Sequence, residues 1–302
     1  MKQKAGDAVV ATATITQQHE EDLQRLRGFR LIDDDFLAKC FDDSPECVEL
    51  VLQIVLSKPD LKVLDVATQV FEANILKRSV RMDVLATDSD GRKFNIEVQR
   101  ADKGAGVKRA RYNSSMLDSK FLEKGSDFDK LNETYVVFIT EHDVMGKGLP
   151  LYSIERYVAE TGEKFGDGSH ILYVNGQYRG ADDVGKLMHD FFCTNPADMH
   201  FPVLADRAKY FKENEEGVAI MCRAMEKLRE DSLQEGIQQG IQQGIQQGIQ
   251  QGIQQGLEKG KLEQAEATAR SMLTDGSLPL DKIAAFSGVP LDRVKELAAE
   301  KQ

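Results

Sequence analysis

The chain has 302 residues, a net charge of −11 at neutral pH and four cysteines without a C-x-x-C spacing. This length suffices for one medium-sized domain with an appendage, and so few scattered cysteines exclude a disulfide scaffold and fit free thiols in a reducing compartment. No stretch approaches the roughly 18 apolar residues of a membrane span, and the N-terminal apolar run is too short for a secretory signal. We therefore expect a cytoplasmic protein that makes no contact with membranes.

The composition divides the chain into four segments. Residues 1–20 are polar and lack any hydrophobic period, so we expect them to be disordered. Residues 21–230 carry the apolar patterns of one domain that mixes helices and strands. A four-residue glycine repeat dominates residues 231–261, and a small helical tail follows at residues 262–302.

Residues 31–57 have apolar side chains at three- and four-residue spacing, which predicts helix. Ser44 and Pro45 interrupt the pattern, with Ser44 as a helix cap and Pro45 in a first helical position, so two short helices are expected. Asp35 and Lys39 lie four residues apart on the first helix. Lys39 either forms a surface ion pair with Asp35 or delivers a positive charge to a neighbouring site.

A β-hairpin is predicted between Met82 and Arg100, after one strand in residues 61–72. Two β-prone runs flank the segment Asp88-Ser89-Asp90-Gly91, in which Asp tolerates left-handed backbone angles and Gly adopts them freely. In the second run Glu97 and Gln99 are two residues apart, so both side chains leave the same face of the strand.

The length of the hairpin loop decides whether Asp83 joins that polar face. A three-residue loop, Ser89 to Gly91, places Asp83 directly opposite Glu97, whereas a two-residue loop turns Asp83 to the other face. We expect the three-residue register. Two carboxylates and an amide oxygen would then converge, and these hard oxygen ligands, with the Val98 carbonyl, are the type that Mg²⁺ prefers.

The pattern D-x14-E-x-Q resembles the core of PD-(D/E)XK nucleases, with Met82 where that motif has proline and Gln99 where it has lysine. More narrowly, the stretch RMDVLATDSDGRKFNIEVQR is similar to the recombination-promoting nucleases and putative transposases of the Rpn family. The resemblance extends over roughly residues 30–302, beginning at Asp35-Phe36-Leu37-Ala38-Lys39.

The resemblance implies an α/β fold of the restriction-endonuclease type, a small mixed sheet flanked by helices, with an α-helical C-terminal extension. It also implies a Mg²⁺-dependent DNA endonuclease linked to recombination or transposition. Asp83 and Glu97 would then bind the metal ion and Gln99 would orient the attacking water. Lys39 is a candidate for the positive charge that Gln99 lacks.

The net negative charge argues against binding of nucleic acid, but the distribution of charge along the chain is compatible with such binding. Between Lys77 and Arg111 there are ten basic and five acidic residues, so this window has a charge of +5. The helix predicted at residues 106–123 follows the E-x-Q strand directly. Candidate phosphate contacts in and before it are Arg100, Lys108, Arg109 and Arg111. The alternative is a solvated face that is rich in lysine and arginine.

Residues 135–140 and 171–174 are apolar runs that predict strands buried on both faces, completing a sheet of about five strands. Residues 182–192 and 202–229 are predicted helices. The histidines at 170, 189 and 200 are scattered, and their spacing does not indicate a zinc site.

From Gly236 to Gly260, glycine occupies every fourth position, mostly as G-I-Q-Q. In a helix, each repeat turns through about 400°, so the isoleucine row drifts by about 40° per repeat and favours right-handed winding of a partner helix. Seven glycines cost roughly 7 kcal/mol of helix propensity relative to alanine. The segment is either a self-association helix of a homo-oligomer or a flexible linker.

Three functions are compatible with these patterns. The first is a metal-dependent DNA endonuclease. The second is a catalytically inactive protein of the same fold that binds DNA or assembles, and the third is a structural oligomer without affinity for DNA. The small tail after residue 262 has the apolar pattern of a helix-turn-helix core, but its last helix carries charges of both signs, which favours packing or assembly over base readout.

Overall fold

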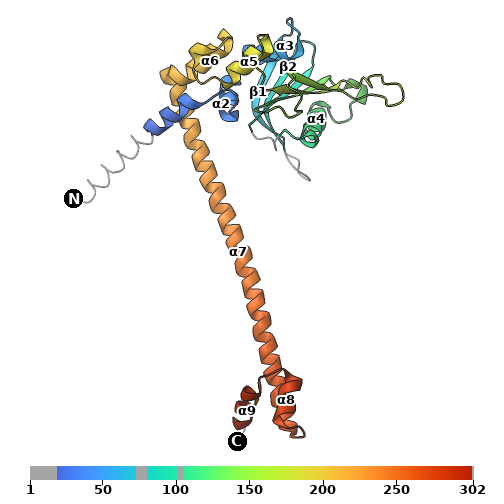
Figure 1. Cartoon of the computed structure of the whole chain (residues 1–302), viewed down its shortest axis with the longest axis vertical. Helices are drawn as coiled ribbons and strands as arrows, with labels where there is room; N and C mark the ends of the chain where they lie inside the picture. The colour runs from blue at the N-terminus through green and yellow to red at the C-terminus, as the bar shows by residue number, and fades with distance from the viewer. Residues whose placement is uncertain (1–18, 73–79, 101–104, 301–302) are drawn as a thin grey trace, which may run out of the picture. The chain divides into compact units, whose positions relative to one another are not determined.

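The computed structural model describes residues 19–72, 80–100 and 105–300 (Figure 1). The chain forms two compact units, Met1–Glu226 and Lys227–Gln302. The segment predicted to be disordered lies outside the described residues, apart from its last two positions, which begin a helix over residues 19–28.

A six-stranded mixed sheet forms the centre of the first unit, in the spatial order β1-β2-β3-β4-β6-β5. The first three strands are antiparallel, β3, β4 and β6 run parallel, and β5 adds an antiparallel edge. The bounds are Val63–Glu72 (β1), Val80–Asp88 (β2), Lys93–Gln99 (β3), Thr134–Thr140 (β4), Leu151–Ile154 (β5) and Ser169–Asn175 (β6). The α/β mixed sheet predicted from the sequence is confirmed, with β5 as an additional short strand.

Apolar residues on both faces of the sheet explain its central position. Every residue of β4 is buried, with Val137 and Ile139 in one core and Val136 and Phe138 in the other. Such a continuous apolar run cannot face water on either side, so helices cover both faces.

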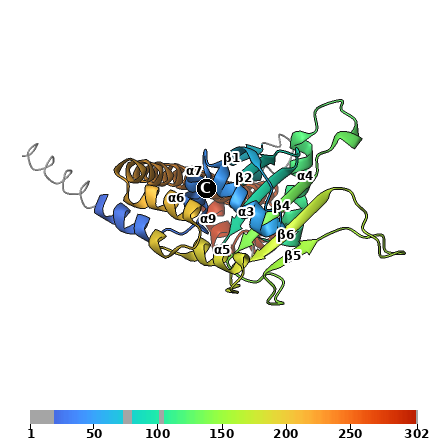
Figure 2. The same ribbon diagram turned by 90° about the horizontal axis from the view of Figure 1, so that it is seen from above.

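Helices form one layer on each face of the sheet (Figure 2). The larger core packs the sheet against α2 (Asp34–Phe41), α3 (Pro45–Leu56), α5 (Asp183–Phe192) and α6 (Pro202–Glu213). Helix α4 (Val107–Phe121) covers the opposite face through Ala110 and Leu117. Two short 3-10 helices, Phe128–Lys130 and Pro196–Asp198, lie in the connections.

The break between α2 and α3 is confirmed, with Pro45 in the first turn of α3. Ser44 is the N-cap residue of α3, as predicted, but its hydroxyl donates to Glu46 Oε2 at 3.5 Å and makes no side-chain capping bond.

The single helix expected over residues 202–229 is divided at Asn214. This residue has an extended backbone, and its side chain accepts hydrogen bonds from the amides of Glu216 and Gly217. A Cβ atom at Gly217 would come within 2.2 Å of the Tyr210 carbonyl oxygen, so glycine permits the close junction. Helix α6 therefore ends and α7 (Glu215–Asp275) begins there.

The second unit contains most of α7, then α8 (Leu280–Ser287) and α9 (Leu291–Ala299). The glycine repeat lies within α7 as helix. A small core joins α8 and α9 to the end of α7 through Ala269, Ile283, Val289, Val294 and Leu297. None of the helices in the described part of the chain is long and apolar enough to cross a membrane.

Candidate active site

The turn of the β2–β3 hairpin fixes the position of Asp83. Thr87 pairs with Lys93, and the Asp88 amide donates to the Arg92 carbonyl at 3.2 Å, which leaves a three-residue loop, 89–91, in which Gly91 has a φ of +80°. The Asp88 carboxylate accepts hydrogen bonds from the amides of Asp90 and Arg92, which stabilises this loop. Continued by one residue beyond its last pair, this register sets Asp83 against Glu97, as predicted. Val84 and Met82 lie in the cores on opposite faces of the sheet, so the regular alternation of side chains is interrupted at Asp83.

The two strands separate beside these carboxylates. Backbone pairing between β2 and β3 ends at Val84 and Ile96, although both strands continue beyond that pair. Asp83 Oδ2 accepts a hydrogen bond from the Val98 amide at 3.1 Å, in place of a backbone carbonyl of β2. Glu97 Oε1 accepts one from Asn95 Nδ2 at 3.0 Å. The strand separation thus leaves room for two acidic side chains at one point of the sheet.

Both carboxylates are buried, with exposed fractions of 7% for Asp83 and 0% for Glu97. Burial, and after it the negative charge of Glu97, raise the pKa of Asp83 to about 7. Burial also raises the pKa of Glu97. Two buried carboxylates that lie close together are each harder to ionise. A bound cation would favour their charged forms.

Arg109 of α4 forms an ion pair with Glu97, one of these two carboxylates. Its Nη2 lies 2.9 Å from Glu97 Oε2, and its Nη1 donates to Gln99 Oε1 at 2.8 Å. The sequence predicted Arg109 as a phosphate contact on the flank of a helix. In the structure, the guanidinium of Arg109 contacts both polar residues of the E-x-Q motif, Glu97 and Gln99. Its contact with phosphate stays a prediction.

Two site neighbours were missed by the sequence analysis. The charges of Asp34, in the first turn of α2, and of Arg81 act on Asp83. Arg81 Nη2 lies 3.9 Å from Asp34 Oδ2. The run of three aspartates at residues 33–35 was the available signal for Asp34.

Lys39 stays a prediction without a supporting contact. It lies five residues after Asp34 in α2, which corresponds to about 7.5 Å along the helix axis and a rotation of about 140°. The alternative ion pair with Asp35 is absent among the described residues. Asp35 instead accepts a hydrogen bond from Gln69 at 3.3 Å.

The other predicted phosphate contacts divide into two kinds. Arg100 Nη1 lies 2.9 Å from Asp33 Oδ1, so its charge is already partly compensated. Lys108 and Arg111 are exposed at the start of α4. A DNA-binding role of these residues remains a prediction.

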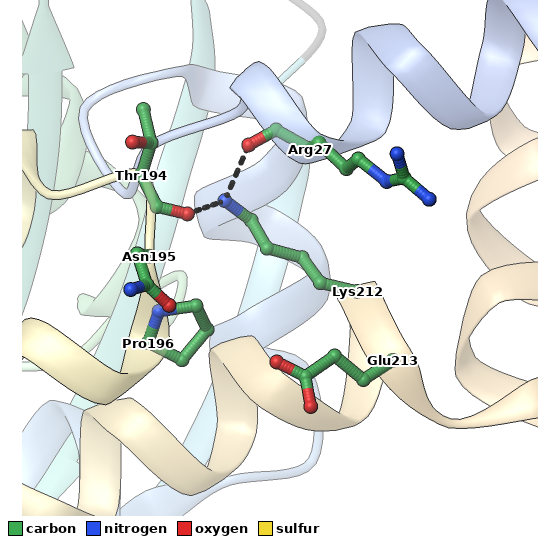
Figure 3. A pocket seen from close by; sticks show the side chains of 6 residues that line it. All are labelled: Arg27, Thr194, Asn195, Pro196, Lys212 and Glu213. Carbon is green, nitrogen blue, oxygen red and sulfur yellow. Dashed lines mark hydrogen bonds between the residues drawn. The ribbon is translucent and has the colours of Figure 1, made fainter.

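A pocket outside the carboxylate site is shown in Figure 3. It is lined by Arg27, Thr194, Asn195, Pro196, Lys212 and Glu213. Lys212 Nζ donates to the carbonyls of Arg27, Phe29 and Thr194, and burial lowers the pKa of this lysine. These bonds tie α6 to the end of the helix over residues 19–28, to the residue that follows that helix and to the connection after α5, so the lysine has a structural role.

Two of the three histidines that are scattered in the sequence, His189 and His200, lie close together in the structure. His189 and His200 both contact the buried carboxylate of Asp190, and the three residues form a possible metal-binding group. Spacing alone could not reveal it, because the connection after α5 brings His200, ten residues after Asp190, back to the end of that helix.

The comparisons with known proteins identify the central part of the chain. Residues 51–176 match the family model of the PD-(D/E)XK nuclease family transposases. The chain is similar to that family over this segment. The segment includes Asp83, Glu97, Gln99 and Arg109, and it is shorter than the expected resemblance over residues 30–302. Searches of curated proteins and of solved structures gave no significant match.

The PD-(D/E)XK assignment supports a nuclease or transposase type of function. Nucleases of this superfamily generally use divalent metal ions. The donor set at the strand separation suits such an ion, because it offers carboxylate oxygens in a site where negative charge is otherwise unfavourable.

Proposed function

We propose that the protein is a Mg²⁺-dependent endonuclease that hydrolyses phosphodiester bonds in DNA. The observation that carries the proposal is the burial of two mutually interacting carboxylates, Asp83 and Glu97, where the pairing of β2 with β3 ends. We propose further that cleavage serves recombination or transposition in the cytoplasm.

Asp83 and Glu97 would hold the metal ion, with the Val98 carbonyl as a third oxygen donor. A bound Mg²⁺ supplies neutralisation of phosphate charge and acidifies water. The hydrogen bond from the Val98 amide fixes one oxygen of Asp83 and thereby orients the carboxylate. Glu97 is oriented in the same way by Asn95.

Gln99 would orient the attacking water through its amide group. Its Oε1 accepts from Arg109, which fixes the plane of the amide. Gln99 carries no charge, so stabilisation of the pentacoordinate phosphate by a protein cation must come from another residue. Arg109 is the residue best placed for this role, and Lys39 is the alternative.

The DNA would be positioned by basic residues at the start of α4. Lys108 and Arg111 are exposed on the helix that also presents Arg109 to the motif. Phosphate contacts of this kind hold a duplex without reading its sequence. Arg100 would join them by exchanging its contact with Asp33 for a phosphate.

Plasmid nicking tests the proposal directly. Supercoiled plasmid is incubated with Mg²⁺ and the wild type, Asp83→Asn or Glu97→Gln. Asp65→Asn is the matched control, because Asp65 is an exposed carboxylate on β1. We expect nicking by the wild type and the control, and a loss of about 10³-fold in both site variants. DNA binding without Mg²⁺-dependent nicking by the wild type would favour the inactive DNA-binding alternative.

We also propose that α7 associates with a second copy of the chain. The five isoleucines of its repeat are 51–60% exposed, and apart from the adjacent residues and backbone of the helix itself, no atom of the described residues lies within 4 Å of a Cβ built on any of the seven repeat glycines. An uncharged surface with apolar residues at a four-residue spacing matches another copy of itself. Sedimentation equilibrium of the full chain tests this, and a monomer at all concentrations would contradict it.

A further inference from the structure

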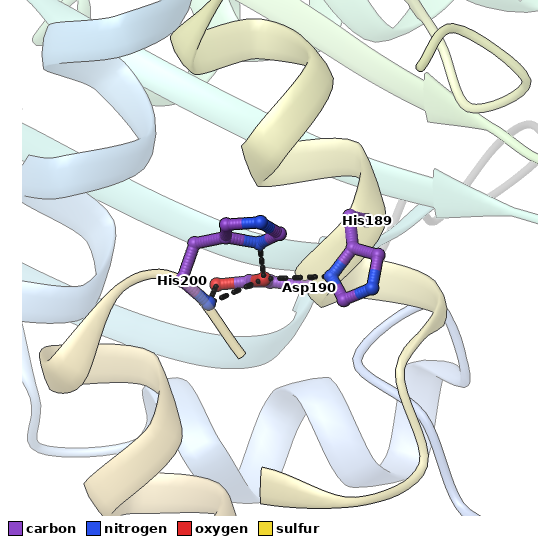
Figure 4. Close-up of side chains that lie close together, drawn as sticks. All are labelled: His189, Asp190 and His200. Carbon is purple, nitrogen blue, oxygen red and sulfur yellow. Dashed lines mark hydrogen bonds and ion pairs between the residues drawn. The ribbon is translucent and has the colours of Figure 1, made fainter. Parts of the chain in front are cut away.

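The last turn of α5 and the segment before α6 together form a compact group of metal-ligating side chains (Figure 4). His189 and Asp190 belong to α5, and His200 follows the 3-10 helix Pro196–Asp198. Their ligand atoms lie within 4.8 Å of one another. These residues lie outside the segment matched by the nuclease family model.

Both imidazoles converge on a single carboxylate oxygen. His189 Nδ1 lies 3.1 Å and His200 Nδ1 lies 3.0 Å from Asp190 Oδ1. Two ligands of a tetrahedral zinc ion, each at about 2.0–2.1 Å, are about 3.3 Å apart. The two Nδ1–Oδ1 distances are therefore a few tenths of an ångström shorter than in such a site, and a shift of the imidazoles would bring the three atoms around one ion.

The carboxylate is held in place by the backbone. Asp190 is fully buried, and the backbone amide of His200 donates to both of its oxygens, at 2.8 Å to Oδ1 and 2.9 Å to Oδ2. The amide of Phe201 donates to Oδ2 at 2.8 Å. Such bonds fix the orientation of a metal-ligating carboxylate. The site also lies at the C-terminal end of α5, where the helix dipole favours a cation.

The imidazoles leave an entry path for an ion. The side chains of His189 and His200 are 40% and 43% exposed, whereas Asp190 is inaccessible. On binding, each neutral imidazole would carry its proton on Nε2, so that Nδ1 offers a lone pair. The Nδ1 to Oδ1 hydrogen bonds are thus exchanged for metal bonds without a change in the charge of the protein.

We propose that His189, Asp190 and His200 bind a divalent first-row transition metal ion such as Zn²⁺. Two imidazole nitrogens and one carboxylate select such an ion over Mg²⁺, which prefers oxygen ligands. Bound there, the ion ties the end of α5 to the start of α6. This site is separate from the carboxylate pair Asp83 and Glu97, and it does not depend on the proposed nuclease activity.

The test is metal binding by the full-length protein after removal of metal with a chelator. Zn²⁺ is titrated calorimetrically under reducing conditions, and Co²⁺ is added separately to follow its visible absorption. We expect one equivalent of Zn²⁺ per chain that survives a 100-fold excess of Mg²⁺, and a Co²⁺ spectrum with imidazole ligation. Zn²⁺ should also raise the Tm.

His189→Gln and His200→Gln should each weaken Zn²⁺ binding at least tenfold and abolish the shift in Tm. His170→Gln is the control, because His170 contacts Glu133 and Glu155 and should leave binding unchanged. Asp190→Asn is less informative, since loss of its backbone contacts can unfold the region. Absence of stoichiometric binding by the wild type, or binding that both histidine variants retain, would overturn the proposal.

Discussion

Arg109 Nη2 lies 2.9 Å from Oε2 of Glu97, so the carboxylate of the nuclease motif is paired with a cation from the following helix. Glu97 has no exposed side-chain surface, whereas Arg109 is 42% exposed. The motif residue is therefore fixed by its neighbour, and the guanidinium can move towards solvent or a substrate.

Replacing Arg109 should separate its two effects. In Arg109→Ala, the buried Glu97 loses its cationic partner, so the free energy of unfolding without metal should fall by roughly 1–3 kcal/mol. Nicking should fall by about 10²-fold if the guanidinium stabilises phosphate charge. Arg109→Lys should recover part of both losses. Thermal unfolding and plasmid nicking measure the effects, and full activity of Arg109→Ala would exclude the catalytic contribution.

The raised pKa of Asp83 predicts how stability depends on pH. An unfolded aspartate has a pKa of about 4, and the folded one has a pKa of about 7, so the folded protein binds more protons between these values. Without metal, the free energy of unfolding should therefore decrease as the pH rises from about 4 to 7. Asp83→Asn should lack this component, whereas Asp65→Asn should retain it. Urea unfolding across this range provides the measurement.

The exposed basic residues of α4 should contribute to DNA affinity without sequence preference. Lys108→Ala and Arg111→Ala should each weaken binding by similar factors on unrelated duplexes and reduce the slope of log K against log salt by about one. Lys186→Ala on α5, on the opposite side of the sheet, is the control. Fluorescence anisotropy at several salt concentrations measures these slopes. A contribution that differs strongly between sequences would indicate base contacts instead.

Alanine in the glycine repeat should have opposite effects on helix formation and association. Gly244→Ala with Gly248→Ala should stabilise α7 by about 1 kcal/mol per site, because alanine is the better helix former. The added methyl groups should weaken pairing of two copies if their backbones approach closely. Circular dichroism and sedimentation equilibrium measure the two effects. Stronger association of the variant would contradict close approach at these glycines.

The hairpin register was predictable because local chemistry determines it. The Asp88-Ser89-Asp90-Gly91 turn sets the loop length, and the loop length sets which residues face each other. The central strand β4 was predictable for a similar reason, since an uninterrupted apolar run must be buried on both faces. Strand β5 was missed because its four residues lie at the edge and are only partly buried.

Side-chain direction and long-range contacts were not predictable from spacing. The sequence places Arg109 on a helix after the motif, but packing of α4 on the sheet decides that it reaches Glu97 rather than solvent. His200 reaches Asp190 only because the connection after α5 returns to it. The sequence likewise does not distinguish Asp34 from the two adjacent aspartates. Its charge acts on Asp83 only because the fold brings α2 close to β2.

The most direct test of the central claim is to locate the metal ion. Crystals grown with Mn²⁺, which takes the same oxygen ligands as Mg²⁺, would give an anomalous signal. We predict one strong peak within about 2.5 Å of a carboxylate oxygen of Asp83 and one of Glu97. A metal-loaded crystal without a peak between these two residues would contradict the proposed active site.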